Sequence, residues 1–274
     1  YGTFDGYGHT ITYQASFIGT TEKGNYALFG LVEGGTLENI NVNADVTISG
    51  TENDMQVALL CGKLTNKQTE TSAGSKPTIY SYTYSYGIIR NCNVNGNINS
   101  TVTSERGGTD AGLLVGESQG QIKYCNGVGN VRGVGYVGGL VGQMSTGSYR
   151  EKYQKSAYIP FYGTAYYDAY SDYMYYESSV IGSSFIGTVI ADSPSTDHNE
   201  PQYGSFAGGI CGYANDNTEI TFCYVSASIN LGNHKEGINN EESGIVSTAL
   251  NGSGSPTVTN NYAEGTINGV PIED

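Results

Sequence analysis

The chain has 274 residues, including 40 glycines and 24 tyrosines, and carries 12 Lys and Arg against 26 Asp and Glu. The net charge of −14 repels phosphate backbones and anionic membrane surfaces, so no nucleic acid partner is expected. No apolar run approaches the roughly 20 residues that a membrane span needs, which predicts no direct membrane insertion. A composition rich in Gly, Tyr, Thr and Asn favours strands and tight turns over helices.

A short glycine-marked segment recurs along the chain. Its copies are LFGLVE (28–33), ALLCGK (58–63), GLLVGE (112–117), GGLVGQ (138–143), GGICGY (208–213) and SGIVST (243–248). The shortest spacing between equivalent residues of successive copies, from Val115 to Val141, is 26 residues. This length fits one coil of a repeat fold in which each coil buries its inner face by stacking on its neighbours.

A second segment follows each copy. In the last part of this segment, apolar or small residues occur at every second position, as they do on one face of a strand. The pattern predicts an all-β, single-domain parallel β-helix or β-solenoid of about six rungs over residues 1–274. Two long Tyr-rich insertions, at about 63–87 and 143–179, are expected on one side. The aligned columns are Leu37, Ile89, Ile122, Ile181, Ile220 and Val258; Ile40, Cys92, Cys125, Ser184, Cys223 and Asn261; Val42, Val94, Gly127, Ile186, Val225 and Ala263; Ala44, Gly96, Gly129, Thr188, Ala227 and Gly265; and Val46, Ile98, Val131, Ile190, Ile229 and Ile267.

The five cysteines fall into the repeat columns, and none belongs to a C-x-x-C pair. Cys92, Cys125 and Cys223 share one column, while Cys61 and Cys211 share another. We expect them to be reduced and to face inward as small apolar residues. No metal site and no cofactor are predicted.

The repeat resembles a known motif. GGLVG, followed by GQIKYCNGVGNVRG (120–133), is similar to the GLUG motif of bacterial surface proteins, which occurs in large adhesins and in regions of IgA-specific metallopeptidases. The opening GTFDGYGHTI resembles the F-D-G-x-G-H-x-I segment that often precedes such repeats in exported proteins of gut bacteria. The resemblance implies a β-helix-like adhesin or stalk module, extracellular or on a cell surface. The peptidase residues have no counterpart, since H-E-x-x-H is absent and His9, His198 and His234 are scattered.

The chain begins in mid-pattern with YGTFDG and shows no cap-like helix. Open ends of stacked strands normally need a polar cap. We therefore expect a fragment of a longer exported polypeptide, or ends that other chains cover.

The two insertions hold 14 of the 24 tyrosines and leave from the same corner of the repeat. The copy between them has the shortest turn. We therefore expect the two insertions to form two walls roughly 10 Å apart, with a low surface strip between them. Such a strip suits a glycan or a host surface protein. The alternative is that the tyrosines cover the solenoid or each other. The candidate ligand-binding residues are Tyr80, Tyr82, Tyr84, Tyr86, Tyr162, Tyr166, Tyr167, Tyr170, Tyr173, Glu117, Gln119 and Gln121.

Function is expected to be non-enzymatic adhesion or ligand binding. GESQG (116–120) and GVGYVG (133–138) match catalytic and nucleotide-binding patterns, but neither leads into a predicted helix. One alternative, a carbohydrate-active β-helix enzyme such as a polysaccharide lyase or glycosidase, needs facing carboxylates or a calcium site in a groove. Another, a structural spacer, predicts no groove and insertions packed flat. Candidate acids are Asp168, Asp172 and Glu177, and candidate calcium loops are ANDNTE (214–219) and DSPSTDHNE (192–200).

Overall fold

The computed structural model describes residues 2–19, 24–51, 54–102, 108–193, 205–232, 241–247 and 256–272. These residues form strands and turns without a helix, and most of the strand pairs are parallel. The prediction of an all-β chain with a parallel architecture is confirmed at this level. Over the described residues, no helix is long and apolar enough to cross a bilayer.

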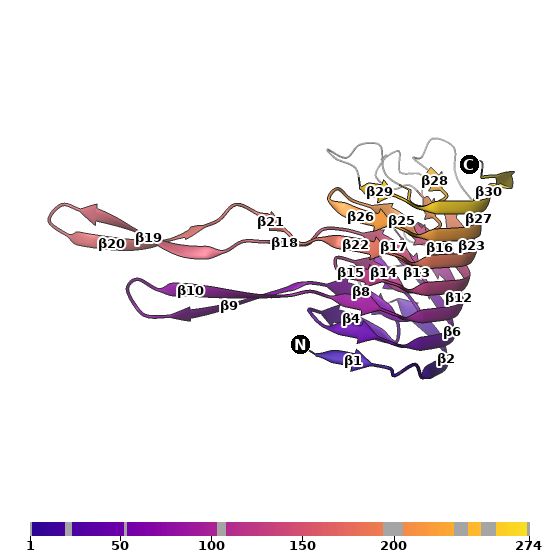
Figure 1. The fold of residues 1–274 in the computed structure, drawn as a ribbon, viewed down its shortest axis with the longest axis horizontal. Coiled ribbons are helices and arrows are strands. Elements are labelled where there is room, and N and C mark those ends of the chain that lie inside the picture. The colour runs from indigo at the N-terminus through magenta and orange to yellow at the C-terminus, as the bar shows by residue number, and fades with distance from the viewer. Residues whose placement is uncertain are drawn as a thin grey trace.

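The strands stack in layers, with the two chain ends at opposite ends of the stack (Figure 1). Sheet 1 contains short parallel strands, in the order β1 (Thr3–Asp5), β5 (Thr36–Glu38), β11 (Ile88–Arg90), β15 (Gln121–Lys123), β22 (Ser178–Ile181), β26 (Thr218–Thr221) and β29 (Thr257–Thr259). Sheet 2 follows it along the chain with longer strands. They are β2 (Thr10–Gly19), β6 (Asn41–Gly50), β12 (Asn93–Val102), β16 (Asn126–Gly138), β23 (Ser184–Asp192), β27 (Tyr224–Leu231) and β30 (Tyr262–Ile267), with β31 (Val270–Pro271) antiparallel at the end.

Two further parallel sets complete each layer. Sheet 3 contains β3 (Asn25–Tyr26), β7 (Met55–Val57), β13 (Thr109–Gly112), the end of β16, β24 (Phe206–Gly208) and β28 (Glu241–Ser243). Sheet 4 contains β4 (Phe29–Glu33), β8 (Cys61–Thr65), β14 (Val115–Ser118), β17 (Val141–Met144) and β25 (Cys211–Ala214). The glycine-marked segments form sheets 3 and 4 and the turn between them, whereas the second segments form sheets 1 and 2.

The core is the apolar interior of the stack. Val42 pairs with Val94, which pairs with Gly127, and Val46, Ile98 and Val131 form another inward column four residues along each strand. The valines and isoleucine of these two columns are at most 2% exposed. Because side chains two residues apart point to one face, each strand places one row inside and a polar row outside.

The predicted register of the fourth copy is wrong by one residue. Ile122 pairs with Val180 rather than Ile181, and Gly127 pairs with Phe185 rather than Ile186. Phe185 is fully buried, while Ile186 is 47% exposed. The buried ring occupies the space that Gly139 leaves, since a Cβ on Gly139 would lie 2.3 Å from Phe185 Cγ. Consequently Ser183, Phe185, Gly187 and Val189 fill the columns assigned to Ser184, Ile186, Thr188 and Ile190.

The opening segment adds a layer that the repeat alignment did not include. Phe4 pairs with Leu37 in sheet 1, and Ile11 pairs with Val42 in sheet 2. Residues 3–19 therefore continue the stack beneath the first aligned copy.

All five cysteines are free and buried, as predicted. Cys61 and Cys211 lie in one column of sheet 4, where both connect through Val115 and Val141. Burial raises the pKa of Cys61 to about 12, so its thiol stays protonated.

Both predicted insertions are antiparallel hairpins that project from the same side of the stack (Figure 1). The first contains β9 (Lys67–Ala73) and β10 (Ile79–Ser85). The second contains β18 (Ser148–Tyr149) with β21 (Met174–Tyr175) near its base, and then β19 (Lys152–Ile159) with β20 (Gly163–Tyr170).

Candidate functional site

The two hairpins contact each other along their length and form one projection, which we call the arm (residues 67–85 and 148–175). Gln68 Nε2 donates a hydrogen bond to the carbonyl of Arg150 at 3.0 Å, and the amide of Thr78 donates to Gln154 Oε1 at 2.7 Å. Between these contacts, the hydroxyl of Tyr82 lies 3.0 Å from the carbonyl oxygen of Lys152 and also accepts from the Lys152 amide. The arm is therefore held together by backbone as well as side-chain groups.

A charged cluster also joins the two hairpins. Lys152 forms an ion pair with Asp168 at 2.9 Å, and its ammonium lies 4.8 Å from the centre of the Tyr80 ring. The hydroxyl of Tyr80 donates to Asp168 Oδ1 at 3.2 Å. Hydrogen bonding from Lys152 lowers the pKa of Asp168, which keeps this carboxylate ionised and engaged within the arm.

Four tyrosines clamp the base of the arm, and we call them the basal tyrosine cluster. The Tyr149 ring centre lies 4.7 Å from both Tyr84 and Tyr176, and Tyr86 packs edge-on against Tyr176 at 5.9 Å. Tyr176 is only 6% exposed. Such ring pairs contribute about 0.5–1.5 kcal/mol each beyond the area that they bury. Sequence reasoning missed Tyr149 and Tyr176.

The tyrosines proposed from the sequence divide into three groups. Tyr80, Tyr82 and Tyr84 lie on the face of the first hairpin that contacts the second, where they are half-buried. Their side chains and those of the second hairpin occupy the space in which an open strip was expected, which is the packing alternative. Tyr86 belongs to the basal tyrosine cluster. The exposed group comprises Tyr162, Tyr166, Tyr167, Tyr170 and Tyr173.

The side chains of the short turn between the hairpins (residues 117–121) also mostly contact other groups of the protein. Glu117 is buried, forms an ion pair with Lys63 at 2.5 Å, and accepts from Gln119 Nε2 at 3.2 Å. Gln121 accepts a hydrogen bond from Lys123 at 2.9 Å. Of these proposed binding residues, Glu117 lines a cavity, which is described below.

The tip of the second hairpin is the most exposed apolar part of the arm. The amide of Tyr162 donates to the carbonyl of Ile159 at 3.1 Å, which closes a turn with Pro160 and Phe161 at its centre. Phe161 has a φ of 69° and its side chain is fully exposed. A bulky residue with positive φ is uncommon, and Gly or Asn normally fills this position of a turn. The tip therefore displays an aromatic ring at the expense of local backbone stability.

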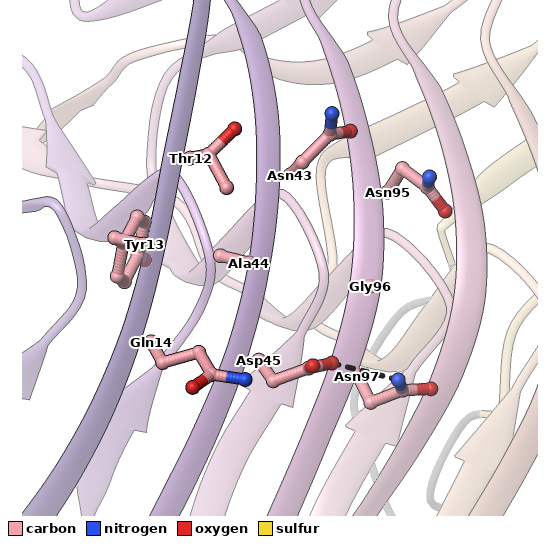
Figure 2. Close-up of a pocket in the computed structure, with 9 residues that line it drawn as sticks. All are labelled: Thr12, Tyr13, Gln14, Asn43, Ala44, Asp45, Asn95, Gly96 and Asn97. Atoms are coloured by element: carbon pink, nitrogen blue, oxygen red, sulfur yellow. Dashed lines mark hydrogen bonds between the residues drawn. The ribbon is translucent and has the colours of Figure 1, made fainter.

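A second surface is the polar groove on the outer face of sheet 2, with a volume of about 590 Å³. Figure 2 shows Thr12, Asn43 and Asn95 along one side and Gln14, Asp45 and Asn97 along the other. Asn97 Nδ2 donates to Asp45 Oδ1 at 2.7 Å, and Asn130 donates to Asn97 in the next layer at 2.7 Å. These amide ladders join successive layers, so part of the groove lining has a structural role.

The residues considered for the enzyme alternative do not come together. Asp168 is paired with Lys152, and Asn217 in the ANDNTE segment has a φ of 59°, within a turn that Thr218 closes by donating to the carbonyl of Asn215 at 2.7 Å. Most of the DSPSTDHNE segment lies outside the described residues. Within the described part of the chain, no group of three or more His, Cys, Asp or Glu residues is arranged to hold a metal ion.

No family model, curated protein or solved structure matches this chain. The resemblance to GLUG repeats therefore rests on the sequence motifs alone.

Proposed function

We propose that this chain is a non-enzymatic adhesion module that binds a partner through the exposed aromatic tip of its arm. The single observation that carries the proposal is the fully exposed Phe161 in a strained turn of a projecting hairpin. A strained backbone lowers stability, and exposed apolar side chains that gather at one place mark interaction sites, so their combination at a protruding tip favours a role in binding.

The tip has the composition of a protein-binding anchor. Tyr158 and Tyr162 are 75% and 89% exposed, and Ile159 is 44% exposed. Ile159 and Phe161 carry no hydrogen-bonding group in their side chains, so their burial favours an apolar pocket over a hydroxyl-rich glycan. Aromatic anchors are frequent at the energetic centres of protein interfaces. We therefore favour a protein of a host surface as the partner of the tip.

The paired hairpins support this role mechanically. The two hairpins are joined by hydrogen bonds, an ion pair and the basal tyrosine cluster. The arm therefore loses less conformational entropy when it binds a partner. Weak contact by one module is sufficient when many copies act together on a surface.

The same proposal includes the finer statements about fold and location. The layered parallel sheets, with registers that connect equivalent residues of successive repeats, support classification as a β-solenoid. Together with the GLUG-like motifs, this supports an exported bacterial protein, extracellular or cell-surface.

The two alternatives predict different geometry. A spacer needs no projecting arm, whereas the hairpins extend away from the stack (Figure 1). An enzyme needs carboxylates that are free to act, but Asp168, one of the three candidate acids, is paired with Lys152 at 2.9 Å. The projecting arm and this ion pair favour binding over catalysis.

The test is replacement of Phe161 by Asn, which suits a positive φ but removes the ring. We expect unchanged or higher thermal stability and at least tenfold weaker attachment of the labelled protein to cultured epithelial cells. Phe222→Asn is the matched control, because Phe222 has a φ of 54° and is 65% exposed on the stack itself.

Equal attachment by wild type and Phe161→Asn would reject the tip as the contact surface. Loss of attachment by both variants would indicate a general effect of removing exposed rings. Protease treatment of the cells should abolish attachment, whereas loss after periodate oxidation alone would identify a glycan partner instead.

A further inference from the structure

A cavity of about 370 Å³ lies at the corner between sheets 3 and 4. Sheet 3 contributes Gln56, Asp110 and Tyr136 to its lining, and sheet 4 contributes Lys63, Glu117 and Gln143. The volume is in the range of sites that hold small molecules. The cavity is formed by the stack, and its lining includes none of the arm residues.

Glycine brings the two sheets close enough to form this corner. A Cβ added to Gly116 would lie 2.7 Å from the amide nitrogen of Val57 and 2.9 Å from the carbonyl oxygen of Asp110. Any side chain at this position would push the strands apart. The absence of one lets outward-facing residues from both sheets converge on a single space.

The three carboxyl groups of the cavity differ in their surroundings. Asp54 is exposed at its edge. Glu117 forms an ion pair with Lys63 and accepts from Gln119 and from Ser145 Oγ at 3.3 Å, so the lysine balances its charge. Asp110 is only 6% exposed. Its burial raises its pKa to about 8, and the charges of Glu117 and Asp54 act in the same direction. At neutral pH, Asp110 is therefore a neutral O–H donor.

Gln56 supplies the complementary acceptor. Its Nε2 donates to the backbone carbonyl of Asp54 at 2.7 Å and to Asp110 Oδ2 at 3.1 Å. Since the Asp54 carbonyl can only accept, the orientation of the amide is fixed. Gln56 is 3% exposed, and its Oε1 has no hydrogen-bond partner among the described residues. An unpaired buried polar atom costs about 1–3 kcal/mol, which a ligand that donates a hydrogen bond would recover.

An aromatic wall closes the cavity toward the next layer. The Tyr136 ring stacks on Tyr213, with centres 4.7 Å apart and planes 19° apart, and Phe206 packs beside them at 5.3 Å from Tyr136. This group holds the Tyr136 ring in place. A fixed aromatic face beside a donor and an acceptor suits a ring that carries both C–H and O–H groups.

We propose that this cavity binds a neutral polyhydroxylated ring, a single sugar unit, with one hydroxyl donating to Gln56 Oε1 and accepting from Asp110. Tyr136 provides the platform for the ring. The lysine charge is balanced by Glu117, and the carboxylate of Asp54 at the exposed edge of the cavity disfavours an anionic ligand. This site is separate from the tip of the arm and does not depend on the proposed adhesion.

The test is binding of a panel of free sugars, measured by saturation-transfer NMR and followed by titration. The panel is glucose, galactose, mannose, fucose and N-acetylglucosamine, with glycerol as a small polyol. We expect at least one sugar to bind to the wild type, with tenfold or greater loss of affinity in Gln56→Leu and in Tyr136→Leu. Far-UV circular dichroism and thermal melting establish that each variant is folded.

Asn95→Ala is the matched control, because Asn95 is an exposed amide in the groove of sheet 2, outside the cavity. This variant should bind like the wild type. Loss of binding in Asn95→Ala but not in Gln56→Leu would place the sugar in the groove and overturn the proposal. Absence of binding by the wild type to every sugar in the panel would also overturn it.

Titration of Asp110 provides a readout that does not depend on truncating a side chain. The groups that face it are Gln56, Asp54, Lys63, Glu117 and Tyr136. Wild-type affinity should fall at least threefold between pH 7 and pH 9 as Asp110 loses its proton. In Asp110→Asn, which donates without titrating, the affinity should not change over this range. The same pH dependence in both proteins would contradict the role assigned to Asp110.

Discussion

Replacing Asp110 by Asn should change how the stability of this protein depends on pH. The unfolded carboxyl titrates near its ordinary value of 3.8, whereas burial raises the folded pKa to about 8. Below pH 4 both states are protonated. Between about pH 4 and pH 8 unfolding releases a proton, so stability falls as the pH rises, and above pH 8 both states are ionised. At about 1.4 kcal/mol for each pKa unit, this carboxyl accounts for a loss on the order of 5 kcal/mol across the interval.

Urea unfolding at pH 4.5, 6 and 8 measures this effect, with tyrosine fluorescence and far-UV circular dichroism as probes. The free energy of unfolding of Asp110→Asn should exceed that of the wild type by an amount that grows steadily with pH. Asp172→Asn, which removes an exposed carboxylate from the arm, controls for net charge. If the wild type and Asp110→Asn show the same pH slope, the carboxyl is ionised in the folded state and the reasoning is wrong.

Other predictions follow from glycine geometry, the basal tyrosine cluster and the thiols. Gly129→Ala places a Cβ 1.7 Å from a carbonyl oxygen at a φ of 146°, so urea unfolding should show a loss above about 3 kcal/mol, against about 1–2 kcal/mol for Gly163→Ala in open space. Tyr176→Phe removes a buried hydroxyl without a described partner, so melting should be unchanged or higher, and a lower midpoint would reveal a missed hydrogen bond. Because burial raises the pKa of Cys61 to about 12 and of Cys223 to about 11, Ellman's reagent should find close to five thiols only after denaturation, and three or fewer would indicate a disulfide.

The layered architecture was predictable because apolar periodicity and repetition act together. A column such as Val46, Ile98 and Val131 has to be buried in every layer, so its register can be read from the sequence. The predicted register of the fourth copy was wrong because the apolar residues of this copy occur in adjacent pairs, such as Phe185 with Ile186. Periodicity is consistent with either member of such a pair, and the choice depends on the space that Gly139 leaves for the Phe185 ring.

The contacts of the arm could be predicted only in part. The alternation in YSYTYSY indicates a hairpin with one tyrosine face, but the sequence does not reveal which face another hairpin covers. The hydrogen bond between Tyr82 and the Lys152 backbone depends on the distance, along the stack, between the two layers from which the hairpins emerge. The one available signal for the tip was Pro160-Phe161 between Ile159 and Tyr162, a turn without the expected Gly or Asn.

The cavity was missed because its residues lie outside the aligned apolar columns. Asp110 sits two residues before Gly112, in a column that holds Gln56 and Tyr136 in the adjacent layers. An acidic residue next to a glycine-marked strand was a usable signal. Its burial, however, results from the close approach of sheets 3 and 4 at Gly116, which only the three-dimensional structure reveals.

The most direct test of the central claim is the attachment of a variant that lacks the second hairpin. Residues 143–179 would be replaced by ESQGQ, the five-residue connection by which residues 117–121 close the neighbouring layer. Attachment of the labelled variant to cultured epithelial cells is compared with that of the wild type. We expect at least tenfold weaker attachment, with the β-sheet circular dichroism spectrum of the stack preserved. Undiminished attachment by this folded variant would contradict it.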